Sequence, residues 1–232
     1  MRVRKGKDAM SKWEKTVEIF RQIKGGIWLT AATCFMLFLY APLELLFTNQ
    51  DEFWFDVYVL APLMLAAFGI GCAGGVLLFF FLRKMGEKLY RVSLAAGFAV
   101  FIGLYVQGNF LAAGLPSLDG ERVDWSLYTA ERIKSVVVWA AAAVLVIFLF
   151  RKLKRYVFER AVQVVSICMI LMLCVTLTTL ALTEDGFSKK PSLSVTTADM
   201  FQMSKDTNFV ILMLDAVDAQ EMGELIKTQP VY

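Results

Sequence analysis

The chain has 232 residues, 58% of them hydrophobic, and carries a net charge of only +3. Its mean hydropathy of +0.59 is too high for a soluble domain and indicates a multi-pass membrane protein. It contains no histidine, which excludes a histidine-based catalytic triad or a histidine-ligated metal within these residues. The four cysteines lie in apolar segments without metal-ligand spacing and are expected to be small buried hydrophobic residues: Cys34, Cys72, Cys168 and Cys174.

Residues 1–26 are predicted to form a basic amphipathic helix on the cytoplasmic surface of the membrane. Apolar residues recur there at roughly helical spacing, with lysines and arginines between them: Met10, Trp13, Val17, Phe20 and Ile23. We expect Gly25–Gly26 to break this helix. The long basic arm has no small-residue cleavage site, so it is not a cleaved signal peptide. Anchoring is favoured over recognition of one particular acidic lipid.

Residues 27–182 are predicted to form a bundle of five transmembrane helices, since about 20 apolar residues cross about 30 Å of hydrocarbon. Glu44, near the outer end of the first helix, is expected to reach the membrane interface rather than to serve an ion pathway. Glycines in the second helix predict close helix packing rather than a cofactor loop: Gly69, Gly71, Gly74 and Gly75. The third helix is short unless Leu89 and Tyr90 extend it. The five apolar stretches are residues 27–47, 57–82, 92–106, 135–150 and 161–182.

The distribution of lysine and arginine predicts the orientation of the bundle. The N-terminal arm and the turns at 83–91 and 151–160 carry most of these residues, whereas loop 48–56 carries none and loop 107–134 carries three. The positive-inside rule then places the N-terminus in the cytoplasm, and five spans place the C-terminal region outside. The predicted localisation is therefore the cell membrane, with a cytoplasmic N-terminus and an extracytoplasmic C-terminus.

The C-terminal region is predicted to be a polar linker, residues 183–207, followed by the start of an extracytoplasmic α/β domain, residues 208–232. The short apolar run at 209–214 is typical of a strand buried on both faces. A helix at 219–227 follows it, as in the opening of an α/β fold. One strand cannot bury both of its faces alone, so we expect this truncated domain to continue beyond Tyr232.

The five-span topology, the linker and the pattern of Asn208, an apolar strand, Asp215 and nearby Asp218 resemble lipoteichoic acid synthase-like and membrane-anchored sulfatase-family proteins of the alkaline phosphatase superfamily. The resemblance implies that Asp215 is a metal ligand at the end of the first catalytic strand. Asp218 is a second candidate, or the N-cap of the following helix. A divalent ion (Mn, Mg, Ca or Zn) that neutralises phosphate or sulfate oxygens needs hard anionic ligands. Without the resemblance, an aspartate that ends a strand at a turn is common.

The function that this resemblance implies is the membrane-anchoring N-terminal part of a metal-dependent hydrolase or transferase. Its substrates would be phosphate or sulfate esters at the outer face of the cytoplasmic membrane, in lipid-linked or cell-envelope polymers. Its partners would be membrane lipids and not nucleic acid. The 232 residues lack the nucleophile and most metal ligands and are expected to be inactive alone. The alternatives are a non-catalytic membrane module that binds lipid or a protein partner and, less favoured for want of ionisable residues within the spans, a small transporter or channel.

Overall fold

The computed structural model of the chain describes residues 12–49, 53, 55–115, 123–183 and 205–207. Contacts divide the chain into two units, Met1–Lys190 and Pro191–Tyr232, and every helix described below belongs to the first. The described residues contain no β-strand. The predicted strand at 209–214 and the helix after it lie outside the described residues, so these expectations remain predictions.

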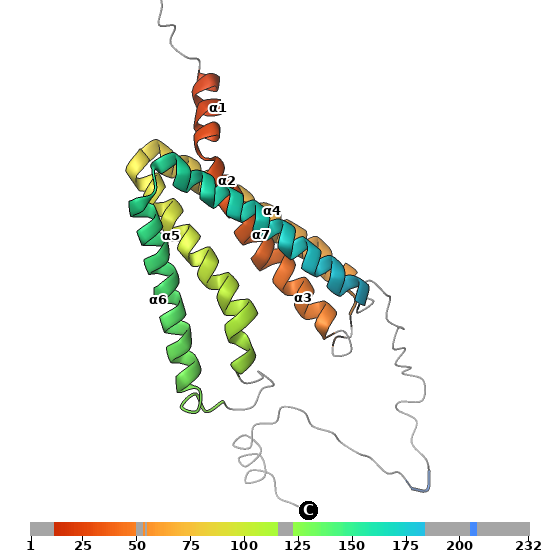
Figure 1. Cartoon of the computed structure of the whole chain (residues 1–232). Helices are drawn as coiled ribbons and strands as arrows, with labels where there is room; N and C mark the ends of the chain where they lie inside the picture. Colours follow the sequence, from red (N-terminus) through yellow and green to blue (C-terminus); the bar gives the residue numbers. More distant parts are fainter. Residues whose placement is uncertain (1–11, 50–52, 54, 116–122, 184–204, 208–232) are drawn as a thin grey trace, which may run out of the picture. The chain divides into compact units, whose positions relative to one another are not determined.

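Five segments in the described residues are long and apolar enough to cross a membrane, which confirms the predicted number of spans. Their order along the chain is visible in Figure 1. A shorter helix, α1, precedes them, and π- and 3₁₀-helical turns extend two of them. The elements are α1 (Lys12–Gln22), α2 (Lys24–Phe35), a π-helix (Met36–Tyr40), α3 (Ala41–Thr48), α4 (Val57–Met85), α5 (Glu87–Val106), a second π-helix (Gln107–Leu111), a 3₁₀ turn (Ala112–Gly114), α6 (Thr129–Lys152) and α7 (Arg155–Thr183).

All five spans are longer than their apolar stretches, because charged residues at their ends continue the helices. Helix α4 ends after Arg83 and Lys84, and α7 begins at Arg155. Long basic side chains keep their hydrocarbon stems along the helix while the charge reaches water, so a helix can continue through them. The third span, expected to be short, runs from Glu87 to Leu111 because the second π-helix prolongs α5.

Helix α2 occupies the centre of the bundle, where it packs against α4, α5 and α7. Helices α5 and α6 are also packed against each other (Figure 1). Aromatic side chains from three helices meet in this core: Phe158 of α7 lies edge-on to Phe98 of α5 and to Phe150 of α6, with ring centroids 6.5 Å and 5.5 Å apart. Edge-to-face pairs of this kind are favourable beyond their buried area. They join α5, α6 and α7 near one end of the bundle.

Two of the four glycines noted in α4 allow it to approach the first span, at α2 and at the π-helix that follows α2. A Cβ on Gly75 would lie only 2.4 Å from Thr30 Cγ2, and one on Gly71 would lie 2.8 Å from the Phe38 ring. Gly69 and Gly74 have no neighbour within 4 Å. Small residues four positions apart are a common device for close contact between membrane helices. The packing interpretation is therefore confirmed for Gly71 and Gly75, whereas Gly69 and Gly74 take no part in this contact.

The prediction that Gly25–Gly26 breaks the first helix is wrong. Helix α1 ends at Gln22, a single turn residue follows, and both glycines lie within α2 and are buried. A Cβ on Gly26 would lie 2.7 Å from the ring of Phe79 in α4. The glycines are needed for contact between neighbouring helices, and they do not end a helix here.

The π-helix at Met36–Tyr40 ends two positions before Pro42. Pro42 occupies the start of α3, where it lacks a backbone N–H and its ring would clash with the carbonyl four residues earlier in a regular helix. A π-helical turn widens the backbone locally and is one of the established ways to accommodate such an interruption. The first span thus stays continuous from Lys24 to Thr48.

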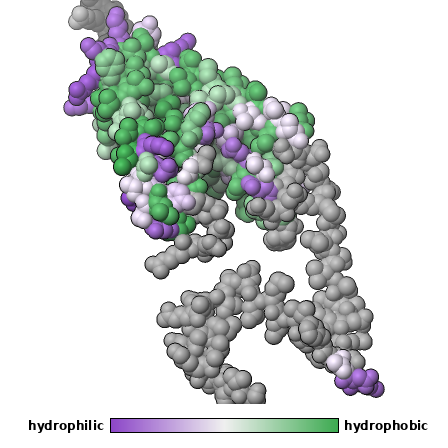
Figure 2. Space-filling model, turned by 60° about the horizontal axis from the view of Figure 1, so that its bottom comes forward, coloured by the Kyte–Doolittle hydropathy of each residue, from purple (hydrophilic) through white to green (hydrophobic). Residues whose placement is uncertain are grey.

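The sides of the helices expose large apolar residues, as expected for surfaces that face lipid. Figure 2 shows hydrophobic residues over the helix surfaces and hydrophilic residues gathered near helix ends. Exposed residues come from every long helix and include Leu63, Ile70, Val100, Val144 and Leu171. A soluble protein rarely exposes so much contiguous apolar surface. The described fold is therefore that of a helical, multi-pass membrane protein.

Candidate functional site

The residues that the sequence singled out for metal binding, Asp215 and Asp218, lie outside the described residues. Within the described part of the chain, no group of three or more His, Cys, Asp or Glu side chains is placed to hold a metal ion. The metal-ligand assignment therefore stays a prediction. The described residues instead bring polar side chains together at one end of the bundle, where α1, α4, α5 and α7 meet.

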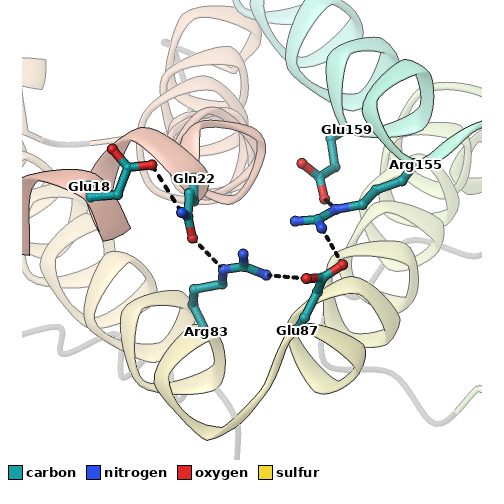
Figure 3. Close-up of polar contacts among 6 residues, drawn as sticks. All are labelled: Glu18, Gln22, Arg83, Glu87, Arg155 and Glu159. Atoms are coloured by element: carbon teal, nitrogen blue, oxygen red, sulfur yellow. Dashed lines mark hydrogen bonds and ion pairs between the residues drawn. The ribbon is translucent and has the colours of Figure 1, made fainter. Parts of the chain in front are cut away.

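A chain of charged and polar side chains joins these four helices (Figure 3). Gln22 of α1 donates from Nε2 to Glu18 Oε1 over 3.0 Å and accepts from Arg83 Nε of α4 over 2.9 Å. Arg83 Nη1 lies 3.8 Å from Glu87 Oε2, at the start of α5. The polar links thus run from α1 through the end of α4 to the beginning of α5.

Arg155 at the start of α7 completes the chain of contacts. Its Nη1 donates to Glu87 and its Nε donates to Glu159 Oε1 over 3.1 Å (Figure 3). Glu87 is therefore shared between two arginines that come from different helices. The Arg155 side chain is about one-third exposed and Glu87 about half exposed. Exposed ion pairs contribute roughly 0–1 kcal/mol each, so the value of this arrangement lies in linking helix ends rather than in any single pair.

Arg83 is the most buried of the side chains that form ion pairs in this network, with 12% of its side chain exposed. Its guanidinium lies 5.7 Å from the centroid of the Tyr90 ring, which is itself edge-on to Phe79. Its Nη1 is buried and makes no hydrogen bond. An arginine can stack on an aromatic face because its guanidinium is planar and weakly hydrated. Arg83 thus connects the α4–α5 turn to the buried aromatic residues of the core.

A polar cavity of about 240 Å³ lies beside this network, between the α1–α2 junction and the first turns of α7. Four cationic side chains and one carboxylate line it, together with polar neutral groups: Arg21, Lys24, Arg155, Arg160, Glu159 and Tyr156. Arg155 is paired with Glu159 and Glu87. No ion pair involves Arg21, Lys24 or Arg160 within the described residues. The cavity is therefore an electropositive recess at the level where two spans begin.

Two larger recesses in the described residues are apolar. One of about 540 Å³ lies between α5 and α6, and one of about 450 Å³ lies between α2, α4 and α5. The first is lined mostly by alanine and valine, with Arg151 at its edge. Grooves of this kind on a membrane bundle are surfaces for lipid tails or neighbouring helices. They offer no chemistry comparable to the polar cavity.

At the opposite end of the bundle, uncharged polar side chains connect the two π-helices. The Tyr40 hydroxyl is 3.5 Å from Asn109 Oδ1, and Trp139 Nε1 of α6 donates to Gln107 Oε1 over 3.3 Å. Each contact joins two spans. Such hydrogen bonds between membrane helices hold the helices together because lipid offers no alternative partner.

The sequence analysis did not predict the network at the basic end of the bundle, although some of its contacts join residues close in sequence. Arg155 and Glu159 are four residues apart within α7, the spacing at which side chains meet on one face of a helix. Arg83 and Glu87 have the same spacing, but they lie in α4 and α5, on either side of Gly86. The contact between Glu87 and Arg155 has no such signal, because 68 positions separate them.

The fold and its surface define a class, the helical multi-pass membrane proteins, and comparison with known proteins does not narrow it further. No family model, curated protein or solved structure matches this chain.

Proposed function

We propose that these residues are the membrane-anchoring N-terminal part of a metal-dependent enzyme that resembles membrane sulfatases and phosphoglycerol transferases. The observation that supports this is the order of parts along the sequence: five candidate spans, a polar segment, and then an apolar run that ends in Asp215. With an odd number of spans, the segment before the first span and the segment after the fifth span would lie on opposite sides of the membrane. A cytoplasmic N-terminus would therefore present residues 184–232 at the outer face, beside envelope substrates.

On this proposal, Asp215 is one ligand of a divalent cation and Asp218 is a weaker candidate. A rigid strand that ends in a carboxylate is suited to the task because Mg²⁺, Mn²⁺, Ca²⁺ and Zn²⁺ all accept carboxylate oxygen. The cation would polarise a phosphoryl or sulfuryl oxygen and stabilise the negative charge of the transition state. The nucleophile and the other ligands would come from later strands of a longer chain.

The test uses the complete open reading frame, purified in detergent and assayed with p-nitrophenyl phosphate, p-nitrophenyl sulfate and phosphatidylglycerol. We expect metal-dependent turnover of at least one substrate. We expect Asp215→Asn to lower both bound metal and turnover by at least about 10- to 100-fold, the loss that even outer-shell partners of a metal produce. Asp218→Asn removes the weaker candidate ligand and is expected to have a smaller effect. A chain that ends at Tyr232 is expected to show no turnover. Metal-dependent activity of that shorter chain, or full activity of Asp215→Asn, would refute the proposal.

A second candidate is a non-catalytic membrane module that binds lipid or a protein partner. It is favoured by one specific observation: the ion-pair network and the electropositive cavity both belong to the helical bundle itself. A module of this kind needs no metal. Absence of bound metal and of turnover in the complete gene product, together with specific lipid or protein binding, would select it over the enzyme.

A further inference from the structure

The cavity between the α1–α2 junction and α7 has a surplus of positive charge that the fold does not neutralise. Its four cations face one lining carboxylate, Glu159, and the neighbouring Glu87 also reaches Arg155. That leaves two positive charges in excess. Arg21, Lys24 and Arg160 are exposed and take part in no ion pair within the described residues. Concentrated cations that repel one another are unfavourable unless an anion joins them.

The positive end of a helix adds to this charge. Helix α7 begins at Arg155, and its first turn contains no acidic residue. The unpaired N–H groups at the start of a helix and the helix dipole both favour an anion there. The cationic side chains and the helix start are independent features, and the structure places both on the same recess.

The size and the donors of the cavity suit a phosphate group. Its volume of about 240 Å³ is below the range of roughly 300–1,000 Å³ typical of sites for drug-sized ligands, so it fits a small head group. Arginines offer planar, paired donors that match phosphate oxygens, and Lys24 adds a point charge. The side chains of Gln163 and Tyr156 provide further donors along the wall.

The position of the cavity along the spans indicates where the phosphate comes from. Two candidate spans, Lys24–Thr48 and Arg155–Thr183, begin at its lining residues. The start of a span coincides with the head-group layer of the bilayer, and basic pockets between helices at that level bind anionic lipid head groups. Tyr156, with 72% of the residue exposed, is the type of side chain that is enriched at this interface.

We propose that this recess is a phosphate-binding site, occupied by the head group of an anionic phospholipid. Arg21, Lys24 and Arg160 would contact the phosphate, and Arg155 would be held in place by Glu87 and Glu159. The assignment rests on the bundle alone. It does not depend on whether residues 208–232 belong to an enzyme.

The experiment measures phospholipid retained by the purified 232-residue chain after extraction from mixed vesicles of phosphatidylglycerol and phosphatidylcholine, by native mass spectrometry. We expect phosphatidylglycerol to be retained preferentially. The variant Lys24→Gln/Arg160→Gln is expected to lose about fivefold of this preference for each cation removed. The matched control is Lys84→Gln/Lys152→Gln, which removes two exposed cations outside the cavity and is expected to keep the preference.

Two further arms separate specific binding from general charge and from loss of folding. The single variant Arg160→Lys, with Lys24 left native, retains the charge. It is expected to keep most of the preference for phosphatidylglycerol, which a misfolded variant would lose. Addition of inorganic phosphate at millimolar concentration tests the second source of the same chemistry. If inorganic phosphate displaces the lipid, or binds when no lipid is present, the phosphate site is supported. Equal losses in the cavity variant and the control would overturn the site.

Discussion

Asp124 lies in the described segment that precedes α6, outside the candidate spans, and accepts two hydrogen bonds from one residue. The Ser126 hydroxyl and the Ser126 backbone N–H both donate to Asp124 Oδ1, over 2.7 Å and 3.0 Å. These hydrogen bonds, the hydroxyl first, lower the pKa of Asp124 below its ordinary value because they favour the charged carboxylate. They form the type of local turn that aspartate commonly makes before a helix.

The sign of the resulting pH dependence follows from a lowered pKa. The turn is stabilised by ionised Asp124 above the ordinary aspartate pKa, and that stabilisation is lost as the pH falls through the lowered value. We predict that Ser126→Ala returns the pKa of Asp124 toward its ordinary value. NMR titration of chains with ¹³C-labelled aspartate in micelles measures this directly, with Ser135→Ala in α6 as a control. An unchanged Asp124 pKa in Ser126→Ala would contradict the prediction.

At the scale of elements, the contact between α2 and α4 depends on which glycine is replaced. We predict that Gly75→Ala lowers the free energy of unfolding by about 1–3 kcal/mol, because the added Cβ would lie 2.4 Å from buried, β-branched Thr30. Gly74→Ala is the matched control, since nothing lies within 4 Å of its Cβ position. It is expected to be neutral or stabilising by up to about 1 kcal/mol through helix propensity.

Unfolding in mixed micelles with increasing sodium dodecyl sulfate, followed by circular dichroism, gives both free energies on one scale. The two variants differ by one position and carry the same substitution, so a difference in stability reports the interhelical contact alone. Equal stability of Gly75→Ala and Gly74→Ala would mean that α2 and α4 do not approach as closely as described.

These elements also show how far the sequence alone can lead. Hydropathy was sufficient for the number of spans, because each apolar stretch is long enough to be recognised without its neighbours. It could not place the ends, since Arg83 and Arg155 continue their helices through charged residues. Glycines in one helix predict packing in general, but only the neighbouring helix decides that Gly75 is in contact and Gly74 is not. The link from Glu87 to Arg155 and the adjacent cavity arise only from tertiary structure.

At the scale of the whole bundle, Glu87 connects the turn between α4 and α5 to the start of α7. We predict that Glu87→Gln lowers the free energy of unfolding by about 1 kcal/mol, because Arg83 and Arg155 both lose a carboxylate while Glu87 itself is half exposed. Glu131→Gln is the control. Glu131 pairs with exposed Lys134 over 3.6 Å within one helix, and its loss is expected to cost about 0.5 kcal/mol or less.

A double-mutant cycle with Arg155→Gln isolates the interaction between helices from the cost of each substitution. We expect the coupling energy between Glu87 and Arg155 to be favourable and to decrease in high salt, because screening weakens partly exposed pairs. A coupling energy near zero at low salt would show that the network does not contribute to holding α5 and α7 together.

The orientation of the bundle in the membrane links the two proposals, and the distribution of charge predicts it. The described end that carries Arg83, Lys84 and Arg155 is richer in cations than the end that carries Asp124 and Glu131. The positive-inside rule therefore predicts that the first end lies in the cytoplasm. We predict that a membrane-impermeant maleimide labels Ser126→Cys in intact cells and labels Lys154→Cys only after permeabilisation. All native cysteines are first replaced by alanine: Cys34, Cys72, Cys168 and Cys174.

The opposite labelling pattern would have unequal consequences for the two proposals. On the proposed topology of five spans, residues 184–232 would lie across the membrane from α1, so a reversed bundle would hold Asp215 in the cytoplasm, away from envelope polymers. The enzymatic proposal would then fail. The phosphate site would remain, because its cations lie at the level of lipid head groups in either orientation. The lipid bound there would then come from the outer leaflet.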